Sequence, residues 1–197
     1  MGQAGPDIIM AHGAGAGSAH PWMQGWKARM ASVGRLHTFD YLYMAQGRKA
    51  PDRLPKLIAR HREVVESVSG QGPVVLWGKS MGSRVGCHLS LELQVDALIC
   101  MGYPLGRNPE KLRDQVLIDL KTPVLFVQGT RDPLCSLEQL AVVREKMTAP
   151  NHLYVVEDGN HSLEVAKRTL KATQTTQADQ DAQIMSAITA FLGDVLG

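Results

Sequence analysis

One serine lies in a sequence context that is typical of a nucleophile. The motif Gly78-Lys79-Ser80-Met81-Gly82 has the form G-x-S-x-G; it follows the apolar run Val74 to Trp77 and precedes the apolar segment Val85 to Leu91. A serine on a tight turn between a buried strand and a helix has strained backbone angles, and flanking glycines remove Cβ atoms that would collide there. The motif therefore predicts that Ser80 stands exposed at the carboxyl end of a strand.

A serine hydroxyl is a weak nucleophile unless a base, usually a histidine oriented by a carboxylate, takes its proton. Both partners follow later apolar runs: Asp132 comes after Val124 to Val127, and His161 comes after Leu153 to Val156. The order along the chain is serine, acid, histidine, with each residue at a predicted strand end. We expect Ser80, Asp132 and His161 to form a catalytic triad for acyl transfer.

A small-residue loop could stabilise the oxyanion that such an attack creates. The segment His12-Gly13-Ala14-Gly15-Ala16-Gly17 follows the first apolar run, Ile8 to Ala11. Small residues let backbone N–H groups approach a reacting carbonyl. We expect the N–H groups of Met81 and Ala14 to form the oxyanion hole, with Gly15 as the alternative to Ala14.

No cofactor or metal is expected. The glycine-rich loop resembles part of a dinucleotide fingerprint, but the third glycine would fall at residue 18, which is serine, and Asp40 is only a weak candidate for the acidic partner. The other histidines show no ligand-like spacing, and the three cysteines are far apart without a CxxC pair. Lys79 suggests a Ser-Lys mechanism, but neighbours at a sharp turn point in different directions, so we expect Lys79 to face outward or to pair with an acid.

The elements that must position these residues alternate along the chain. Short apolar runs predict strands, and two of them mix with polar residues, which predicts the sheet edges: 36–41 and 153–156. Apolar residues at helical spacing lie between the runs, which implies a mostly parallel sheet with helices on both faces. The remaining strands are expected at 8–11, 74–77, 97–101 and 124–127, and the helices at 22–33, 54–68, 85–91, 137–147 and 184–195.

Local signals refine these elements. Ser136 is a plausible N-cap, and Gly70 is placed to end a helix. The connection Pro104 to Pro123 carries apolar residues for one short helix, whereas Lys171 to Gln183 lacks core-forming residues and predicts a flexible loop. Four aromatic residues are candidates for the acyl pocket, although helical spacing makes the two tryptophans more typical of a core: Trp22, Trp26, Tyr43 and Tyr103.

Composition excludes several classes of function. The length of 197 residues, 44% of them hydrophobic, predicts one globular domain, residues 1–197. A net charge of +2 is too balanced to hold nucleic acid. The N-terminus does not resemble a secretion signal, no apolar run approaches the roughly 20 residues that span a bilayer, and the odd number of cysteines suits a reducing compartment. We expect a soluble, cytoplasmic protein with no membrane partner.

The chain resembles the α/β-hydrolase superfamily, and more closely a small capless branch that includes a testis-expressed protein, plant homologues and the α/β domain of a histone-acetyltransferase (NSL) complex subunit. The resemblance is carried by the segments HGAGAG, FDYLYMAQG, GKSMGSRVG, GYPLG, KLRD, PVLFVQGTRDPLC and GNHS. It implies a three-layer α/β sandwich of about six strands without the two leading strands and without a cap domain. It also implies Ser80 as nucleophile, His161 as base, Asp132 as acid, and the HGAGAG loop with Met81 as oxyanion hole.

The sequence therefore predicts a serine hydrolase that cleaves a small carboxylic ester or thioester through an acyl-enzyme. Two alternatives stay open. One is a non-catalytic protein-interaction module on the same fold, because some members of the branch serve in assembly, and it predicts a large exposed apolar patch away from Ser80. The other is an enzyme that cleaves an amide, a dienelactone or a carbon–carbon bond, because one triad serves many reactions on this fold.

Overall fold

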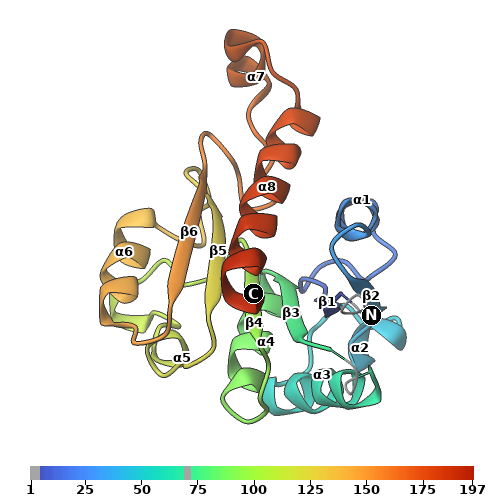
Figure 1. Ribbon diagram of the computed structural model, residues 1–197. Helices are drawn as coiled ribbons and strands as arrows, with labels where there is room; N and C mark the ends of the chain where they lie inside the picture. Colours follow the sequence, from blue (N-terminus) through green and yellow to red (C-terminus); the bar gives the residue numbers. More distant parts are fainter. Residues whose placement is uncertain (1–4, 69–71) are drawn as a thin grey trace.

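The computed structural model describes residues 5–68 and 72–197, and its centre is a six-stranded sheet in the order β2-β1-β3-β4-β5-β6 (Figure 1). All five strand pairings are parallel. The six predicted strands are confirmed, and the two runs that mix with polar residues, β2 and β6, form the edges as predicted. The strands are β1 (Asp7–Ala11), β2 (Arg35–Phe39), β3 (Val74–Lys79), β4 (Ala97–Met101), β5 (Val124–Gly129) and β6 (Asn151–Val156).

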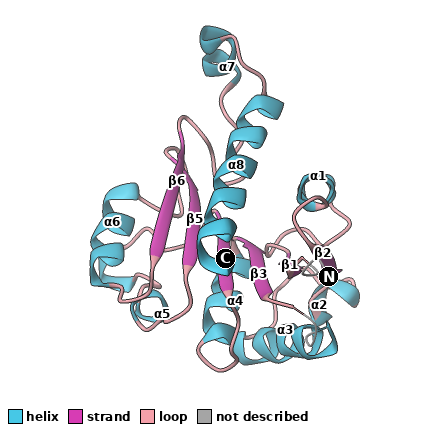
Figure 2. Ribbon diagram, in the orientation of Figure 1, coloured by secondary structure: helices cyan, strands magenta, loops and turns pink. Residues whose placement is uncertain are grey.

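Helices cover both faces of the sheet, because successive strand residues point to opposite sides and both sets are apolar (Figure 2). One core packs α1 and α8 against the side chains of Ile8, Trp77 and Ile99, and the other packs α3 to α6 against those of Ile9, Leu76 and Phe126. This is the expected three-layer sandwich. The helices are α1 (Pro21–Met30), α2 (Leu42–Ala45), α3 (Leu54–Val68), α4 (Met81–Ser90), α5 (Gln115–Ile118), α6 (Leu137–Lys146), α7 (Lys167–Thr173) and α8 (Gln177–Leu196).

The connection between β4 and β5 holds only a 3-10 turn, Pro109–Lys111, and the short helix α5. The predicted short helix is confirmed, and no cap domain is inserted at this point. Ser136 is the N-cap of α6, where its side chain accepts a hydrogen bond from the Gln139 backbone N–H. The predicted helix end at Gly70 lies outside the described residues.

The prediction of a flexible loop at Lys171–Gln183 is wrong. Helix α7 runs to Thr173, and α8 begins at Gln177. In Figure 1, α7 projects beyond the sheet at the amino-terminal end of α8. A capping box begins α8: Thr176 accepts from the Asp179 backbone N–H, and the Asp179 carboxylate accepts from that of Thr176. Such a box satisfies the first free N–H groups of a helix. Helix α8 can therefore begin before its first large apolar residue, Ile184.

The parallel arrangement brings functional loops to one edge of the sheet. The carboxyl ends of β1, β3, β5 and β6 lie at the same edge, because all of these strands run in the same direction. Each is followed by a loop that holds a residue singled out above. Within the described residues, no helix is both long enough and apolar enough to cross a membrane.

Candidate functional site

Ser80 occupies a strained turn between β3 and α4. Its backbone angles are φ 49° and ψ −111°, and a positive φ is costly for a residue other than glycine. Two hydrogen bonds hold the turn: the Ser80 N–H donates to the Met101 carbonyl at 3.1 Å, and the Ser83 hydroxyl donates to the Ser80 carbonyl at 2.6 Å. The predicted strand-turn-helix context is present.

The glycines on either side of Ser80 are required by close backbone approach. A Cβ atom on Gly78 would lie 2.2 Å from the Ser83 nitrogen, and one on Gly82 would lie 2.4 Å from the Ala11 carbonyl oxygen. These distances are far shorter than any van der Waals contact. Only glycine lets α4 start directly against β1 and β3, which aims its first turn at the edge of the sheet.

Three predicted residues form one hydrogen-bonded series. His161 Nε2 lies 2.8 Å from Ser80 Oγ, and His161 Nδ1 lies 2.7 Å from Asp132 Oδ2. A carboxylate can only accept, so Nδ1 carries the imidazole proton and leaves Nε2 free to accept from the serine hydroxyl. The geometry suits the removal of a proton from Ser80.

Asp132 is held by two further donors. Its Oδ1 accepts from the Leu134 N–H at 2.8 Å, and its Oδ2 accepts from the Gln128 side-chain amide at 2.5 Å. Burial raises the pKa of the Asp132 carboxyl, but the hydrogen bonds from His161, Leu134 and Gln128 outweigh it, so the pKa is lowered overall. Asp132 is therefore a carboxylate at neutral pH.

Sequence reasoning missed Gln128. Its amide oxygen also accepts from the Tyr103 N–H at 3.0 Å, so it ties the acid loop to the segment after β4. The signal was a polar residue at the end of a buried strand, VLFVQG, where a fully buried amide needs partners.

The loop after β1 is fixed by its own side chains. His12 Nε2 accepts from the Tyr41 N–H at 3.1 Å, and its Nδ1 donates to the Gly13 carbonyl at 2.6 Å. Burial lowers the pKa of His12, which keeps this ring neutral, as the two bonds require. The Tyr43 hydroxyl donates to the Ala14 carbonyl at 2.8 Å. His12 therefore orders the loop in which it lies.

The predicted oxyanion donors lie around Ser80. Ala14 and Gly15 line a cavity that also contains Ser80 and His161, and Met81 is the first residue of α4. The N–H groups at the start of a helix have no partner within the helix. In residues 5–68 and 72–197, no protein group accepts a hydrogen bond from the N–H of Met81, Ala14 or Gly15.

This cavity, the Ser80 pocket, has a volume of about 230 Å³. No carboxylate stands among the described residues that line it. Of the four aromatic candidates, only Trp22 lines it, whereas Trp26, Tyr43 and Tyr103 are buried in the core. The lining residues are Gly13, Ala14, Gly15, Ala16, His20, Trp22, Met23, Lys79, Ser80, His161 and Ser162.

The prediction that Lys79 faces outward or pairs with an acid is wrong. Only 8% of its surface is exposed, and its ammonium donates to the backbone carbonyl of His161. The side chain also lies against Trp22, with Nζ 5.5 Å from the ring centroid. Lys79 turns inward because the histidine loop and α1 offer it a carbonyl and an aromatic face.

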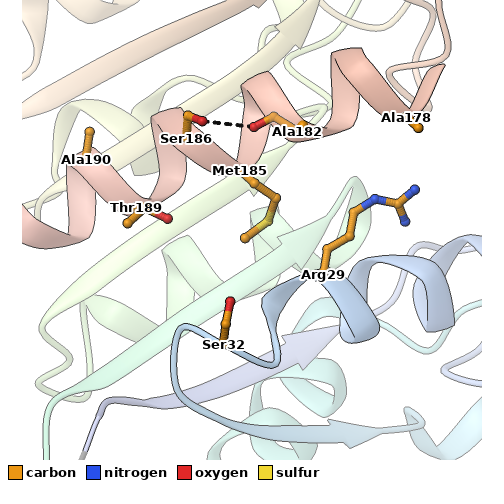
Figure 3. Close-up of a pocket in the computed structure, with 8 residues that line it drawn as sticks. All are labelled: Arg29, Ser32, Ala178, Ala182, Met185, Ser186, Thr189 and Ala190. Carbon is orange, nitrogen blue, oxygen red and sulfur yellow. Dashed lines mark hydrogen bonds between the residues drawn. The ribbon is translucent and has the colours of Figure 1, made fainter. Parts of the chain in front are cut away.

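A larger cavity lies elsewhere, between α1 and α8 (Figure 3). This α1/α8 groove has a volume of about 710 Å³; small residues and Met185 of α8 form one wall, while Arg29 and Ser32 form the other. The Ser186 hydroxyl donates to the Ala182 carbonyl of its own helix at 3.1 Å. No histidine occurs among the described residues that line the groove, so its hydroxyls have no base.

The fold and the site together define a class. The model of a family described as an alpha/beta hydrolase domain matches residues 4–193, and the chain belongs to this family. The narrower capless branch stays a prediction.

Solved structures share the fold. An α/β serine hydrolase without a lid from Xanthomonas campestris is 16% identical with a TM-score of 0.72, and the match covers 97% of this chain and 82% of that one. An esterase from Pyrococcus furiosus is 16% identical with a TM-score of 0.73, covering 98% and 85%. A dienelactone hydrolase from Anabaena variabilis is 17% identical with a TM-score of 0.73, covering 100% and 89%. At these identities the likeness establishes the fold.

Proposed function

We propose that this protein is a serine hydrolase that cleaves a small carboxylic ester or thioester through an acyl-enzyme. The observation that carries the proposal is the series Ser80 Oγ, His161 and Asp132, with distances of 2.8 and 2.7 Å, at the wall of the Ser80 pocket. A nucleophile, a base in the required tautomer and an orienting carboxylate thus meet where a substrate can enter.

In the first half of the reaction, Ser80 Oγ attacks the substrate carbonyl carbon while its proton passes to His161 Nε2. The carbonyl oxygen becomes an oxyanion, which the N–H groups of Met81 and of Ala14 or Gly15 stabilise. The tetrahedral intermediate then expels the alcohol or thiol, which takes the proton from His161, and the acyl group remains on Ser80.

In the second half, water replaces the leaving group. His161 removes a proton from water, the resulting nucleophile attacks the acyl carbon, and the proton returns to Ser80 as the carboxylic acid leaves. Throughout, Asp132 keeps the Nδ1 proton in place and stabilises the imidazolium. The hydrogen bonds from Gln128 and Leu134 hold the carboxylate in position for this task.

The size of the site favours a small acyl group. The Ser80 pocket is about 230 Å³, below the range of roughly 300–1,000 Å³ typical of drug-sized ligands. No cap domain encloses it, since only a 3-10 turn and α5 lie between β4 and β5.

The test is to mix the protein with 4-nitrophenyl acetate or an acetyl thioester and to follow intact mass at short times and steady-state turnover. We expect an acetyl adduct on Ser80 and a loss of about 10³-fold or more in kcat for Ser80→Ala. Ser186→Ala, at a serine without a base, is the matched control and should behave as wild type. Full activity of folded Ser80→Ala would overturn the proposal.

The interaction module predicts an exposed apolar patch. In the described part of the chain, the exposed large apolar residues come from three separate segments: Leu91, Val142 and Val155. No observation favours the module over the enzyme, and a protein partner stays a prediction. Amide, lactone and carbon–carbon substrates belong in the same mass-spectrometric screen.

A further inference from the structure

We propose that Lys79 is a positioning residue for the catalytic base: with Trp22 it holds the backbone of the His161 loop, so that the imidazole stays within reach of Ser80. The inference rests on the proposed function, because it assigns a task to residues beside the proposed triad. It concerns a side chain that the mechanism above does not use.

Two side chains bind consecutive carbonyls of the histidine loop. From the end of β3, the Lys79 ammonium donates to the His161 carbonyl, and from α1, the Trp22 indole N–H donates to the Ser162 carbonyl at 2.9 Å. The Lys79 ammonium also lies over the Trp22 ring, 5.5 Å from its centroid. The loop is thus held from the strand that also presents Ser80, which links the position of the base to that of the nucleophile.

Gly102 shows how closely the ammonium approaches the imidazole. It has φ 69°, and a Cβ atom there would lie 2.7 Å from the His161 carbonyl oxygen, 3.1 Å from Lys79 Nζ and 3.4 Å from His161 Nδ1. The Lys79 ammonium and the His161 imidazole therefore both border the space beside Gly102. Only glycine leaves this space open, so the approach of Lys79 to the His161 loop depends on the segment after β4 as well.

The Lys79 ammonium is a buried positive charge that nearby carboxylates compensate only in part. Across residues 5–68 and 72–197, no carboxylate lies within ion-pair distance of Nζ. The charged and titratable groups that face it are His161, the Asp132 carboxylate on the loop after β5 and the Glu164 carboxylate on the loop after β6. Burial lowers the pKa of Lys79 to about 8, while Asp132 and Glu164 act in the opposite direction.

Burying a cation in this way lowers the free energy of unfolding. An apolar side chain of similar length would not have this effect. Because the folded pKa of about 8 is below the ordinary 10.5, the folded protein holds fewer protons than the unfolded chain between these values. Its stability therefore rises with pH across this window.

The variants are Lys79→Met, Lys79→Arg and Trp22→Phe, with Lys171→Met as a matched change at an exposed lysine. A misplaced reacting group costs up to about 10²-fold in rate, so we expect Lys79→Met to lower kcat by roughly 10- to 100-fold with a smaller change in KM. Lys79→Arg keeps a charged donor and should recover part of this loss. Trp22→Phe removes one hydrogen bond and should have the smaller effect.

Two readouts separate positioning from packing. In Lys79→Met the loss should fall on kcat more than on KM, and Lys79→Arg should recover part of it, because a cationic donor can again bind the His161 carbonyl. The thermal midpoint of Lys79→Met at neutral pH should equal or exceed that of wild type. The rise in stability between pH 8 and 10.5 should also be weaker in this variant.

Wild-type kcat in Lys79→Met would overturn the inference. So would a parallel loss of kcat and thermal stability that Lys79→Arg does not recover, which would indicate packing alone. The His161 imidazole resonances can be followed by NMR without turnover. If wild type forms no acyl-enzyme but these resonances move in Lys79→Met and return toward wild type in Lys79→Arg, the proposed function fails while the positioning role stands.

Discussion

The Ser80 pocket and the α1/α8 groove both present serine hydroxyls at their walls, yet they differ in size and in chemistry. The groove is the larger cavity, about 710 Å³ against 230 Å³. In the groove, Ser186 donates to the Ala182 carbonyl one turn earlier, which is the ordinary use of a serine inside a helix. In the pocket, the Ser80 hydroxyl lies 2.8 Å from an imidazole nitrogen.

The difference follows from how each region is built. Helix faces form most of the walls of the groove, so most of the backbone N–H groups along them are used within the helices. Strand ends and a helix start form the pocket, where N–H groups remain free and loops from distant parts of the chain converge. The reactive groups therefore lie where strand ends and a helix start meet, and a larger cavity volume does not indicate a reactive site.

After the substitution of Ser80 itself, Asp132→Asn is the variant from which we expect the largest effect on this contrast. An amide in place of the carboxylate can donate to His161 Nδ1, which favours the wrong tautomer and leaves Nε2 unable to accept from Ser80. We expect kcat to fall by about 10²- to 10⁴-fold while the fold is kept. Steady-state kinetics and circular dichroism check this, and a change of less than threefold would contradict the assigned role.

The second test compares a glycine of the Ser80 turn with a glycine of α8, the helix that forms one wall of the groove. Gly82→Ala would place Cβ 2.4 Å from the Ala11 carbonyl oxygen, so we expect a loss of about 3 kcal/mol in the free energy of unfolding. Gly193 lies on an exposed part of α8, where an added Cβ would have no atom within 4 Å, and Gly193→Ala should stabilise by about 0.5–1 kcal/mol. Urea unfolding measures both, and similar effects at the two sites would remove the contrast.

The smallest effect is expected at Arg29, which joins α1 to α8 through an ion pair of 2.6 Å with Asp181. The arginine side chain is 36% exposed, so water screens its end of the pair, and the buried Asp181 carboxylate keeps a hydrogen bond from the Gln177 amide at 2.9 Å when the arginine is replaced. Arg29→Met should cost about 1 kcal/mol or less in unfolding free energy and leave kcat unchanged. A loss of activity comparable to that of Asp132→Asn would show that the groove contributes to the reaction.

Much of the fold could be predicted because the signals are local. Apolar runs gave all six strands, and the polar residues in Leu36 to Tyr41 and Leu153 to Val156 placed two of them at the edges. The start of α8 could not be found by apolar spacing. It depends on the Thr176–Asp179 capping box and on the pairing of Asp181 with Arg29, two polar interactions, one of which joins distant parts of the chain.

The residues of the candidate site also fall into those that the sequence predicted and those that it did not. Motif and order placed Ser80, Asp132 and His161 on loops that the parallel sheet brings together, and the structure gives the distances between them. Gln128 was missed and Lys79 was misplaced, because each has a partner far away along the chain: Tyr103 lies 25 residues from Gln128, and His161 lies 82 residues from Lys79. A single sequence does not show which carbonyl a buried lysine meets.

The most direct measurement is to label the folded protein with a fluorophosphonate and to identify every modified peptide by mass spectrometry. The account predicts phosphonylation of Ser80 alone, its loss in Ser80→Ala, much slower labelling in His161→Ala, and no adduct on Ser32 or Ser186 of the α1/α8 groove. Absence of label on Ser80 in folded wild type, or equal labelling of the groove serines, would contradict the central claim that Ser80 is an activated nucleophile.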